Sequence, residues 1–213
     1  MPSFTRYYNT QKELVEVSME EIETLIRNKK NQHKIAEYVY QRLYNRFLKI
    51  FDYKGDQEGI YNKNGTKVKK NIFEEEFKNG FVQLAACSLL IETFAAFLNG
   101  ENETPTRQGS NKFNQVFKYA KEKNNPLREF ENSGFYKKIR CGILHQGETT
   151  GQYTVTRKSD QLLNGKEINT FLFHKALKDL LKIYRDELKN VDWVDRKWDA
   201  CRMKIQHIID NTK

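Results

Sequence analysis

The segment from Asn71 to Asn99 constrains the fold more than any other part of the chain. It carries apolar residues on nearly every face of a helix, and three glutamates at positions 74–76 precede most of them. Acidic residues favour a helix N-terminus, and Asn99-Gly100 is typical of a helix end. A helix that is apolar on most faces is buried on most faces, so we predict a central helix around which the rest packs. Its apolar residues include Phe77, Phe81, Leu84, Cys87, Leu90, Ile91, Phe94, Ala95 and Leu98.

The same segment is not expected to cross a membrane. Its longest apolar run, from Leu84 to Leu98, is interrupted by Ser88, Glu92 and Thr93. A transmembrane helix needs about 20 predominantly apolar residues. The N-terminus also lacks the apolar core of a signal peptide. We therefore predict a cytoplasmic protein with no membrane partner.

Apolar residues recur at helical spacing through most of the remaining chain. The sequence has only 3 Pro and 11 Gly in 213 residues, which favours long helices over a loop-rich β fold. We predict an all-α fold, an antiparallel helical bundle that forms a single domain over residues 1–213. The other expected helices span residues 11–30 (or start at Ser18, where Ser18 and Glu21 match a capping box), 31–53, 110–123, 135–146, 169–188 and 195–211.

Three segments do not follow the helical pattern. Residues 1–10 are expected to form an irregular arm. Residues 54–71 are polar and contain Asn64-Gly65, which predicts a loop or a hairpin. Residues 149–168 combine a β-prone segment with the turn Asn164-Gly165, so we predict a β-hairpin just beyond the helix that ends near position 146.

The charge and the cysteines suggest a class of partner and a compartment. The formal net charge is +9, with a pI near 9.3. A basic balance favours polyanions such as RNA through long-range attraction. The three cysteines, an odd number with no C-x-x-C pair, predict reduced thiols and no zinc site.

The densest group of reactive side chains lies between positions 139 and 148. Arg140 and His145 are five residues apart, which on a regular helix separates them by about 140°. They converge only if the helix loosens at Gly142 or ends near Gly147. A histidine transfers protons near neutral pH, and an arginine offers a planar fork of donors suited to phosphate. The pair therefore suits binding and cleavage of a phosphodiester.

Neighbouring side chains extend this candidate site. Lys137 and Lys138 lie next to Arg140 and are predicted RNA-binding residues. Glu92 is a carboxylate within the apolar central helix and needs a partner if it is buried. It either orients Arg140 or His145 or lies exposed on a polar stripe. The other residues expected to support the site are Cys141, Gln146 and Glu148.

The string Arg140-Cys-Gly-Ile-Leu-His145-Gln-Gly-Glu resembles the R-x4-6-H motif of HEPN domains (higher eukaryotes and prokaryotes nucleotide-binding). It also looks like bacterial HEPN-like proteins of the abortive-infection and phage-defence kind. The resemblance implies a ribonuclease that needs no metal or cofactor and forms its cleft from the motifs of two protomers. His145 would act as general acid or base, and Arg140 would hold the phosphate. A homodimer is implied, and for a toxin also an antitoxin or regulatory partner.

A non-catalytic helical module that binds RNA or a protein is the alternative hypothesis. Cys141 stands where the family often has a polar residue, which keeps this alternative open. An enzyme requires Arg140 and His145 to reach a shared cleft. A binding module allows the arginine to be tied to a carboxylate in the core. The sequence contains no P-loop, G-x-G-x-x-G, G-x-S-x-G or H-E-x-x-H motif, which argues against several other enzyme classes.

Overall fold

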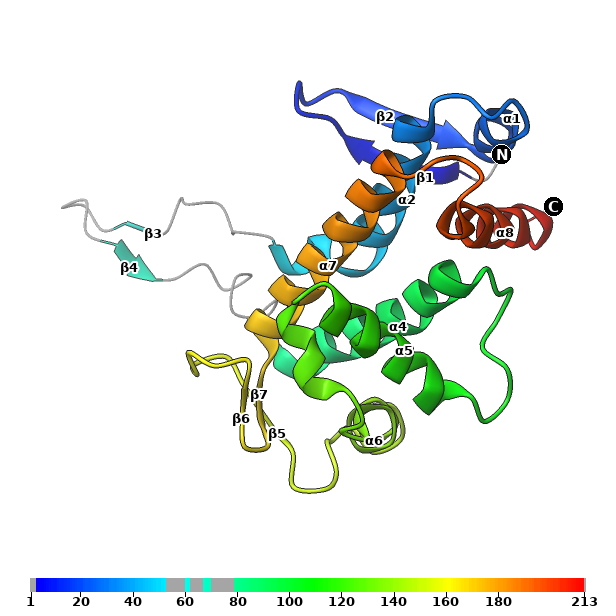
Figure 1. Ribbon diagram of the computed structural model, residues 1–213. Coiled ribbons are helices and arrows are strands. Elements are labelled where there is room, and N and C mark those ends of the chain that lie inside the picture. The colour runs from blue at the N-terminus through cyan, green and yellow to red at the C-terminus, as the bar shows by residue number, and fades with distance from the viewer. Residues whose placement is uncertain (1–2, 53–59, 62–66, 70–78, 213) are drawn as a thin grey trace.

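The fold is described by a computed structural model for residues 3–52, 60–61, 67–69 and 79–212. Helix α4 (Gly80–Asn99) lies at its centre and is mostly buried, so the predicted central helix is confirmed over this range (Figure 1). Its predicted first residues, 71–78, lie outside the described residues. The helices that pack against α4 are α2 (Gln32–Phe47), α5 (Gly109–Glu122), α7 (Thr170–Asn190) and α8 (Arg196–Asp210).

The ends of α4 follow from local chemistry. The side chain of Asn79 accepts a hydrogen bond from the Val82 N–H at 3.1 Å, which caps the N-terminus. Gly100 ends the helix with a φ of +71°, a conformation that glycine adopts without strain. By length and composition α4 would also suit a membrane span, but 56% of that window is buried inside the fold. Such burial is consistent with the core helix of a soluble protein.

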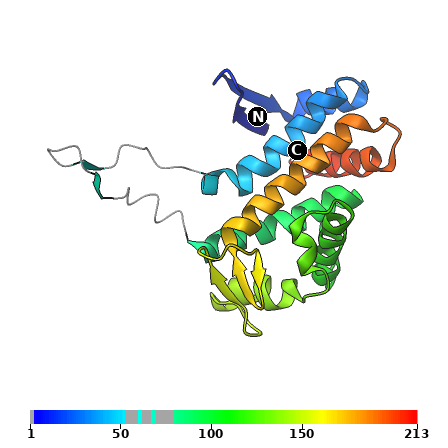
Figure 2. The same cartoon turned by 60° about the vertical axis from the view of Figure 1, so that its left-hand side comes forward.

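The helices are not all antiparallel. Helices α2 and α7 lie side by side along the molecule, as Figures 1 and 2 both show. Helices α4 and α7, however, run in the same general direction. A Cβ placed on Gly80 would lie 3.3 Å from the Thr170 hydroxyl near their first turns. Further along, the rings of Phe94 and Tyr184 are 5.2 Å apart. The predicted antiparallel arrangement therefore fails for this central pair.

The predicted all-α fold is wrong, because small sheets accompany the helices. The described strands are β1 (Ser3–Tyr8), β2 (Leu14–Ser18), β3 (Ile60–Tyr61), β4 (Lys67–Lys69), β5 (Thr154–Thr156), β6 (Leu163–Asn164) and β7 (Glu167–Asn169). They form three sheets with the orders β1-β2, β3-β4 and β5-β7-β6. The fold is mixed, and helices still predominate.

The N-terminal sheet replaces a predicted irregular arm and the start of a predicted helix. Strands β1 and β2 pair antiparallel around a turn in which the Asn9 side chain accepts from the Glu13 N–H at 2.9 Å. Phe4 and Val17 are fully buried, so the hairpin belongs to the core. The helix then begins where the capping box predicts. Ser18 Oγ accepts from the Glu21 N–H at 3.0 Å and caps α1 (Met19–Arg27).

The segment 149–168 forms more than the predicted β-hairpin. Strands β6 and β7 pair antiparallel around Gly165, but β5 joins the other edge of β7 in parallel. This sheet lies at the first turns of α4 and α7 (Figure 2). Most of the predicted loop 54–71 lies outside the described residues. Within it, β3 and β4 pair antiparallel.

Shorter helices complete the chain and prepare the candidate site. The predicted helix 31–53 ends at Phe47 and is followed by the 3-10 helix η1 (Lys49–Asp52). A second 3-10 helix, η2 (Pro126–Phe130), follows α5. Phe135 then enters a cluster of buried rings and anchors the candidate motif to the core. The rings around Phe135 belong to Phe113, Phe117, Phe130 and Phe173.

Candidate functional site

The helix that carries Arg140 and His145 consists of two different turns. The π-helix η3 (Tyr136–Arg140) leads directly into α6 (Cys141–Gln146). The Cys141 N–H donates to the Tyr136 carbonyl, five residues back. Gly147, at a φ of +70°, ends α6 as predicted. The irregular turn therefore includes Arg140 as its last residue and does not lie at Gly142. Isolated π turns occur frequently at functional sites.

The loop after α6 folds back onto this helix. The Lys138 carbonyl accepts hydrogen bonds from the Thr150 N–H at 2.8 Å and from the Thr150 hydroxyl at 3.0 Å. A Cβ placed on Gly142 would lie 2.6 Å from the Glu148 carbonyl oxygen. Only glycine therefore allows the loop to approach so closely. The two halves of the candidate site, helix and loop, form one rigid unit.

Arg140 is held by groups from two elements. Its Nη2 donates to Glu92 Oε2 on α4 at 3.1 Å, and its guanidinium lies 5.3 Å from the Tyr136 ring centre. The Arg140 and Glu92 side chains are 19% and 18% exposed. Burial lowers the pKa of Arg140, but the hydrogen bond and charge of Glu92 outweigh it, so the pKa is raised overall. The arginine is therefore fully charged and oriented, and about one-fifth of its side chain is exposed to solvent.

Tyr136 and Gly109 support Arg140, and sequence analysis assigned no role to either. A Cβ placed on Gly109 would lie 2.2 Å from Cζ of Tyr136, so glycine is required for the ring to lie there. Burial raises the pKa of Tyr136, and nearby Cys141 raises it further while Arg140 opposes the shift. The tyrosine is therefore neutral and presents its ring face to the guanidinium. The spacing of Tyr136 and Arg140, four residues apart in a helix, was an available signal.

The structure does not bring His145 to Arg140 within one chain. His145 lies on the last turn of α6 with its side chain exposed, and among the described residues it has no hydrogen-bond partner. Arg140 instead points toward α4 and Glu92. The preceding residue, Leu144, is 58% exposed.

The two predicted RNA-binding lysines differ in their surroundings. Lys137 is exposed and has no partner among the described residues. Lys138 Nζ donates to the Ser133 carbonyl at 3.2 Å and lies 5.8 Å from the Tyr153 ring centre. A Cβ on Gly151 would lie 3.1 Å from the Lys138 side chain, which shows how closely the loop packs on it. Lys138 holds the loop in place, and Lys137 is the lysine available to a ligand.

The remaining predicted supporting residues are dispersed. Glu148 Oε1 accepts from the Thr149 N–H at 3.0 Å, so its carboxylate stabilises the loop. Gln146 is exposed and has no partner within the described part of the chain. Cys141 is a half-buried free thiol beside Tyr136. Of the predicted residues, the structure therefore joins Glu92 to Arg140, and leaves His145, Gln146 and Lys137 on the surface.

The described residues contain no group of three or more His, Cys, Asp or Glu side chains placed to hold a metal ion. The groups that the candidate site offers for chemistry are the fixed guanidinium of Arg140, the exposed imidazole of His145 and the exposed ammonium of Lys137.

The chain matches no known protein-family model, and it has no significant match among curated proteins or solved structures. The resemblance to HEPN domains therefore rests on the motif at Arg140 and His145.

Proposed function

We propose that the protein is a metal-independent endoribonuclease that cleaves RNA at a composite site in a cytoplasmic homodimer. Its setting would be phage defence or toxin-like growth arrest, and an antitoxin or regulatory partner would control it. The observation that carries the proposal is the fixed position of Arg140 between Glu92 and Tyr136, with His145 exposed five residues further along the same helix. A permanently charged, oriented guanidinium suits a phosphate whose negative charge increases during cleavage.

The reaction uses the 2′-hydroxyl of RNA as its nucleophile. His145 takes the 2′-hydroxyl proton as this oxygen attacks the adjacent phosphorus. The bond from phosphorus to the 5′-oxygen breaks, and the leaving oxygen receives a proton from the protonated His145, which returns to its neutral form. The products are a 2′,3′-cyclic phosphate and a 5′-hydroxyl. Arg140 binds the non-bridging oxygens throughout, and Lys137 contacts a neighbouring phosphate.

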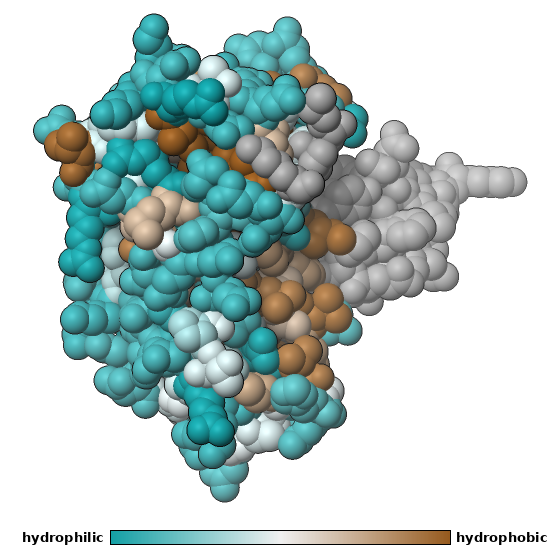
Figure 3. All heavy atoms as spheres, turned by 90° about the vertical axis from the view of Figure 1, so that its right-hand side faces the viewer, coloured by the Kyte–Doolittle hydropathy of each residue, from teal (hydrophilic) through white to brown (hydrophobic). Residues whose placement is uncertain are grey.

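A second protomer supplies the side chains that one chain cannot bring together. Exposed apolar side chains on both sides of the Arg140–Glu92 pair support this part of the proposal. Leu144 precedes His145, and Leu89 lies one helical turn from Glu92 on α4; they are 58% and 47% exposed. Elsewhere on the surface, Figure 3 shows apolar side chains gathered in a band among polar ones. Exposed apolar surface of this kind favours association.

The oligomeric state is tested by sedimentation of the wild type beside Leu144→Asp and Leu89→Asp. Both variants should sediment as monomers. Met203→Asp is the matched control, since Met203 on α8 is 52% exposed and should not affect association. Loss of RNA cleavage together with the dimer would support the composite site, whereas full activity of a monomer would contradict it.

The chemistry is tested with two substrates that differ at one position. An RNA with a single 2′-deoxynucleotide 5′ to the mapped cleavage position should resist cleavage there, because it lacks the attacking hydroxyl. The unmodified RNA should yield a fragment that ends in a 2′,3′-cyclic phosphate. Cleavage of the modified RNA at the same bond would contradict the proposed chemistry.

A non-catalytic module that binds RNA or a protein is the second candidate. The Arg140–Glu92 ion pair favours it, because a guanidinium already bound to a carboxylate has fewer donors left for a phosphate. In that case RNA binding without cleavage should weaken as salt rises. Lys137→Gln should remove one phosphate contact. The slope of the logarithm of the binding constant against the logarithm of the salt concentration should then become shallower by about one.

A further inference from the structure

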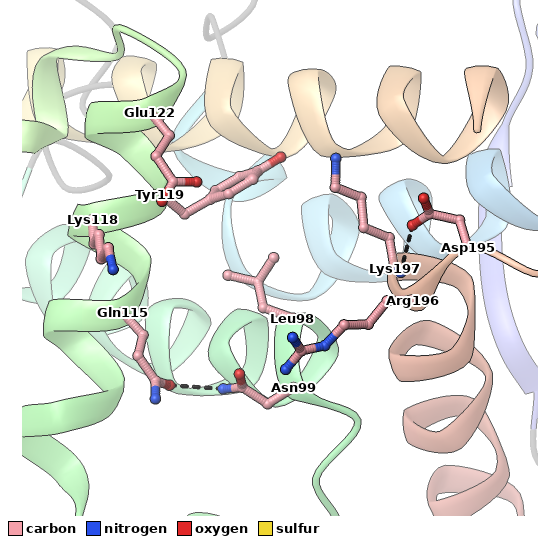
Figure 4. A pocket seen from close by; sticks show the side chains of 9 residues that line it. All are labelled: Leu98, Asn99, Gln115, Lys118, Tyr119, Glu122, Asp195, Arg196 and Lys197. Carbon is pink, nitrogen blue, oxygen red and sulfur yellow. Dashed lines mark hydrogen bonds between the residues drawn. The ribbon is translucent and has the colours of Figure 1, made fainter. Parts of the chain in front are cut away.

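A hollow with a volume of about 490 Å³ lies away from Arg140 and His145. It is formed where the last turn of α4, the outer face of α5 and the first turn of α8 meet (Figure 4). Ligand sites for small molecules have volumes of about 300–1,000 Å³. Leu98 contributes apolar surface at its centre, and the buried Tyr119 lines one wall.

Two cationic side chains that line the hollow have no partner among the described residues. The guanidinium of Arg196 extends toward Leu98 and Asn99, and Lys118 lines the opposite side of the hollow on α5 (Figure 4). Neither side chain forms an ion pair or hydrogen bond within the described part of the chain. They come from different helices, α8 and α5. Their positive charges are therefore available to an anion that fits between them.

Most of the other charged groups around the hollow are already bound. Lys197 pairs with Glu187 at 3.2 Å. The Asp195 carboxylate caps α8 by accepting from the Lys197 N–H at 2.8 Å. Glu122 also lines the hollow and forms no ion pair with the residues that the structure describes, so it offsets part of the charge of Lys118, four residues away. With the two free cations set against one free carboxylate, the hollow has a net positive charge.

The shape of the hollow and its polar groups limit which class of ligand could bind there. A guanidinium binds two oxygens side by side, and an ammonium binds a third. A phosphomonoester has three such oxygens and a charge between about −1.5 and −2 near neutral pH. Asn99 Nδ2 donates to Gln115 Oε1 at 2.7 Å along another edge, where the remaining amide groups face solvent. These amides suit the polar edge of an organic group that lies over Leu98.

We infer that this hollow binds a small phosphomonoester of the size of a nucleoside monophosphate, between Arg196 and Lys118. The site is separate from Arg140 and His145 and does not depend on the proposed nuclease activity.

The test is calorimetric titration of the full-length protein with AMP, adenosine and inorganic phosphate. Arg196→Gln and Lys118→Gln should each weaken AMP binding by about tenfold or more, as expected for loss of a hydrogen bond to a charged group. Lys175→Gln is the matched control, because Lys175 is exposed on α7, outside the hollow, and its loss removes the same charge. It should leave AMP binding unchanged. Circular dichroism of each variant should match that of the wild type, since all three side chains are exposed.

Adenosine should bind at least about tenfold more weakly than AMP, because it lacks the phosphate. Inorganic phosphate should also bind more weakly than AMP, because it lacks the group that covers Leu98. The inference is overturned if AMP does not bind the wild type, or if Lys175→Gln weakens binding as much as the other two variants. Equal affinity for phosphate and AMP would overturn the assignment to an organic phosphate.

Discussion

Arg140 donates to Glu92 across 3.1 Å, although the two residues are 48 positions apart in the sequence. The pair joins the π-helix to the central helix, and both side chains are less than one-fifth exposed. The interaction energy of this ion pair should therefore exceed that of a surface ion pair and remain below that of a fully buried one.

Replacing Glu92 with alanine should lower the free energy of unfolding by about 1–2 kcal/mol, because Arg140 loses its charged partner in a partly buried position. A double-mutant cycle of Glu92→Ala and Arg140→Ala, measured by urea unfolding, should give a coupling energy of about 1 kcal/mol. The exposed pair Lys121–Glu131, at 2.8 Å, is the control and should give less than about 0.5 kcal/mol. If the effects of Glu92→Ala and Arg140→Ala on the free energy of unfolding simply add, the contact between the two side chains is not formed in solution.

Gly109→Ala should destabilise the protein by about 1–3 kcal/mol, because the new methyl group would collide with the Tyr136 ring. The sign of this change in stability is the informative result. Replacing a glycine with alanine in a helix ordinarily stabilises a protein by about 0.4–1 kcal/mol. The displaced ring would no longer lie against Arg140. A gain in thermal stability would mean that Tyr136 does not occupy this position.

Gly142→Ala should cost about 2 kcal/mol or more, because its methyl group would meet the Glu148 carbonyl at 2.6 Å. Gly147→Ala makes a useful comparison in the same loop. No atom lies within 4 Å of a Cβ at Gly147, so only its φ of +70° opposes the change, which costs about 1–2 kcal/mol. Denaturant unfolding should rank Gly142→Ala as the more severe. The reverse order would contradict the close approach of the loop to α6.

Stability should fall as the pH drops below about 6.5, the pKa of an unperturbed histidine. Burial lowers the pKa of His174, and the partial compensation from Asp52 does not restore it. Between the folded and unfolded pKa values the unfolded chain binds more protons, so the free energy of unfolding decreases with falling pH. The Asp52 pKa is itself lowered from 3.8, so its contribution is lost only in more acidic solution.

The expected loss at pH 5.5 is about 1 kcal/mol relative to pH 7.5. His174→Gln should remove this pH dependence, whereas His33→Gln, at an exposed position on α2, should retain it. Urea unfolding at pH 5.5 and at pH 7.5 measures the change in stability for each variant. An unchanged pH profile in His174→Gln would assign the effect to other groups.

The sequence predicted the helices with the most regular apolar spacing. Helix α8 lies within the predicted range 195–211, and α7 begins at Thr170 as predicted. The N-terminal hairpin was missed because Leu14 and Val17 also fit helical spacing. The alternation of Val15 and Val17 fits a strand equally well, and only the burial of Phe4 and Val17 in the core distinguishes the two.

The pairing of β5 with β7 was not predictable from local patterns. The turn at Gly165 predicts the contact of β6 with β7, but a parallel partner depends on how the chain crosses over. In the candidate site, the sequence left open whether Glu92 pairs with Arg140 or His145 or lies exposed, and the structure pairs it with Arg140. Lys137 and Lys138 look equivalent in the sequence, and only the packing of Tyr153 and Gly151 separates their roles.

Cleavage of a mixed RNA pool in EDTA tests the central proposal most directly. The wild type should be compared with Arg140→Ala and His145→Ala, with His33→Ala as the control for loss of an exposed histidine. The account predicts cleavage by the wild type and His33→Ala in the presence of the chelator, and none by Arg140→Ala or His145→Ala. Intact RNA with the wild type, or undiminished cleavage by His145→Ala, would contradict it.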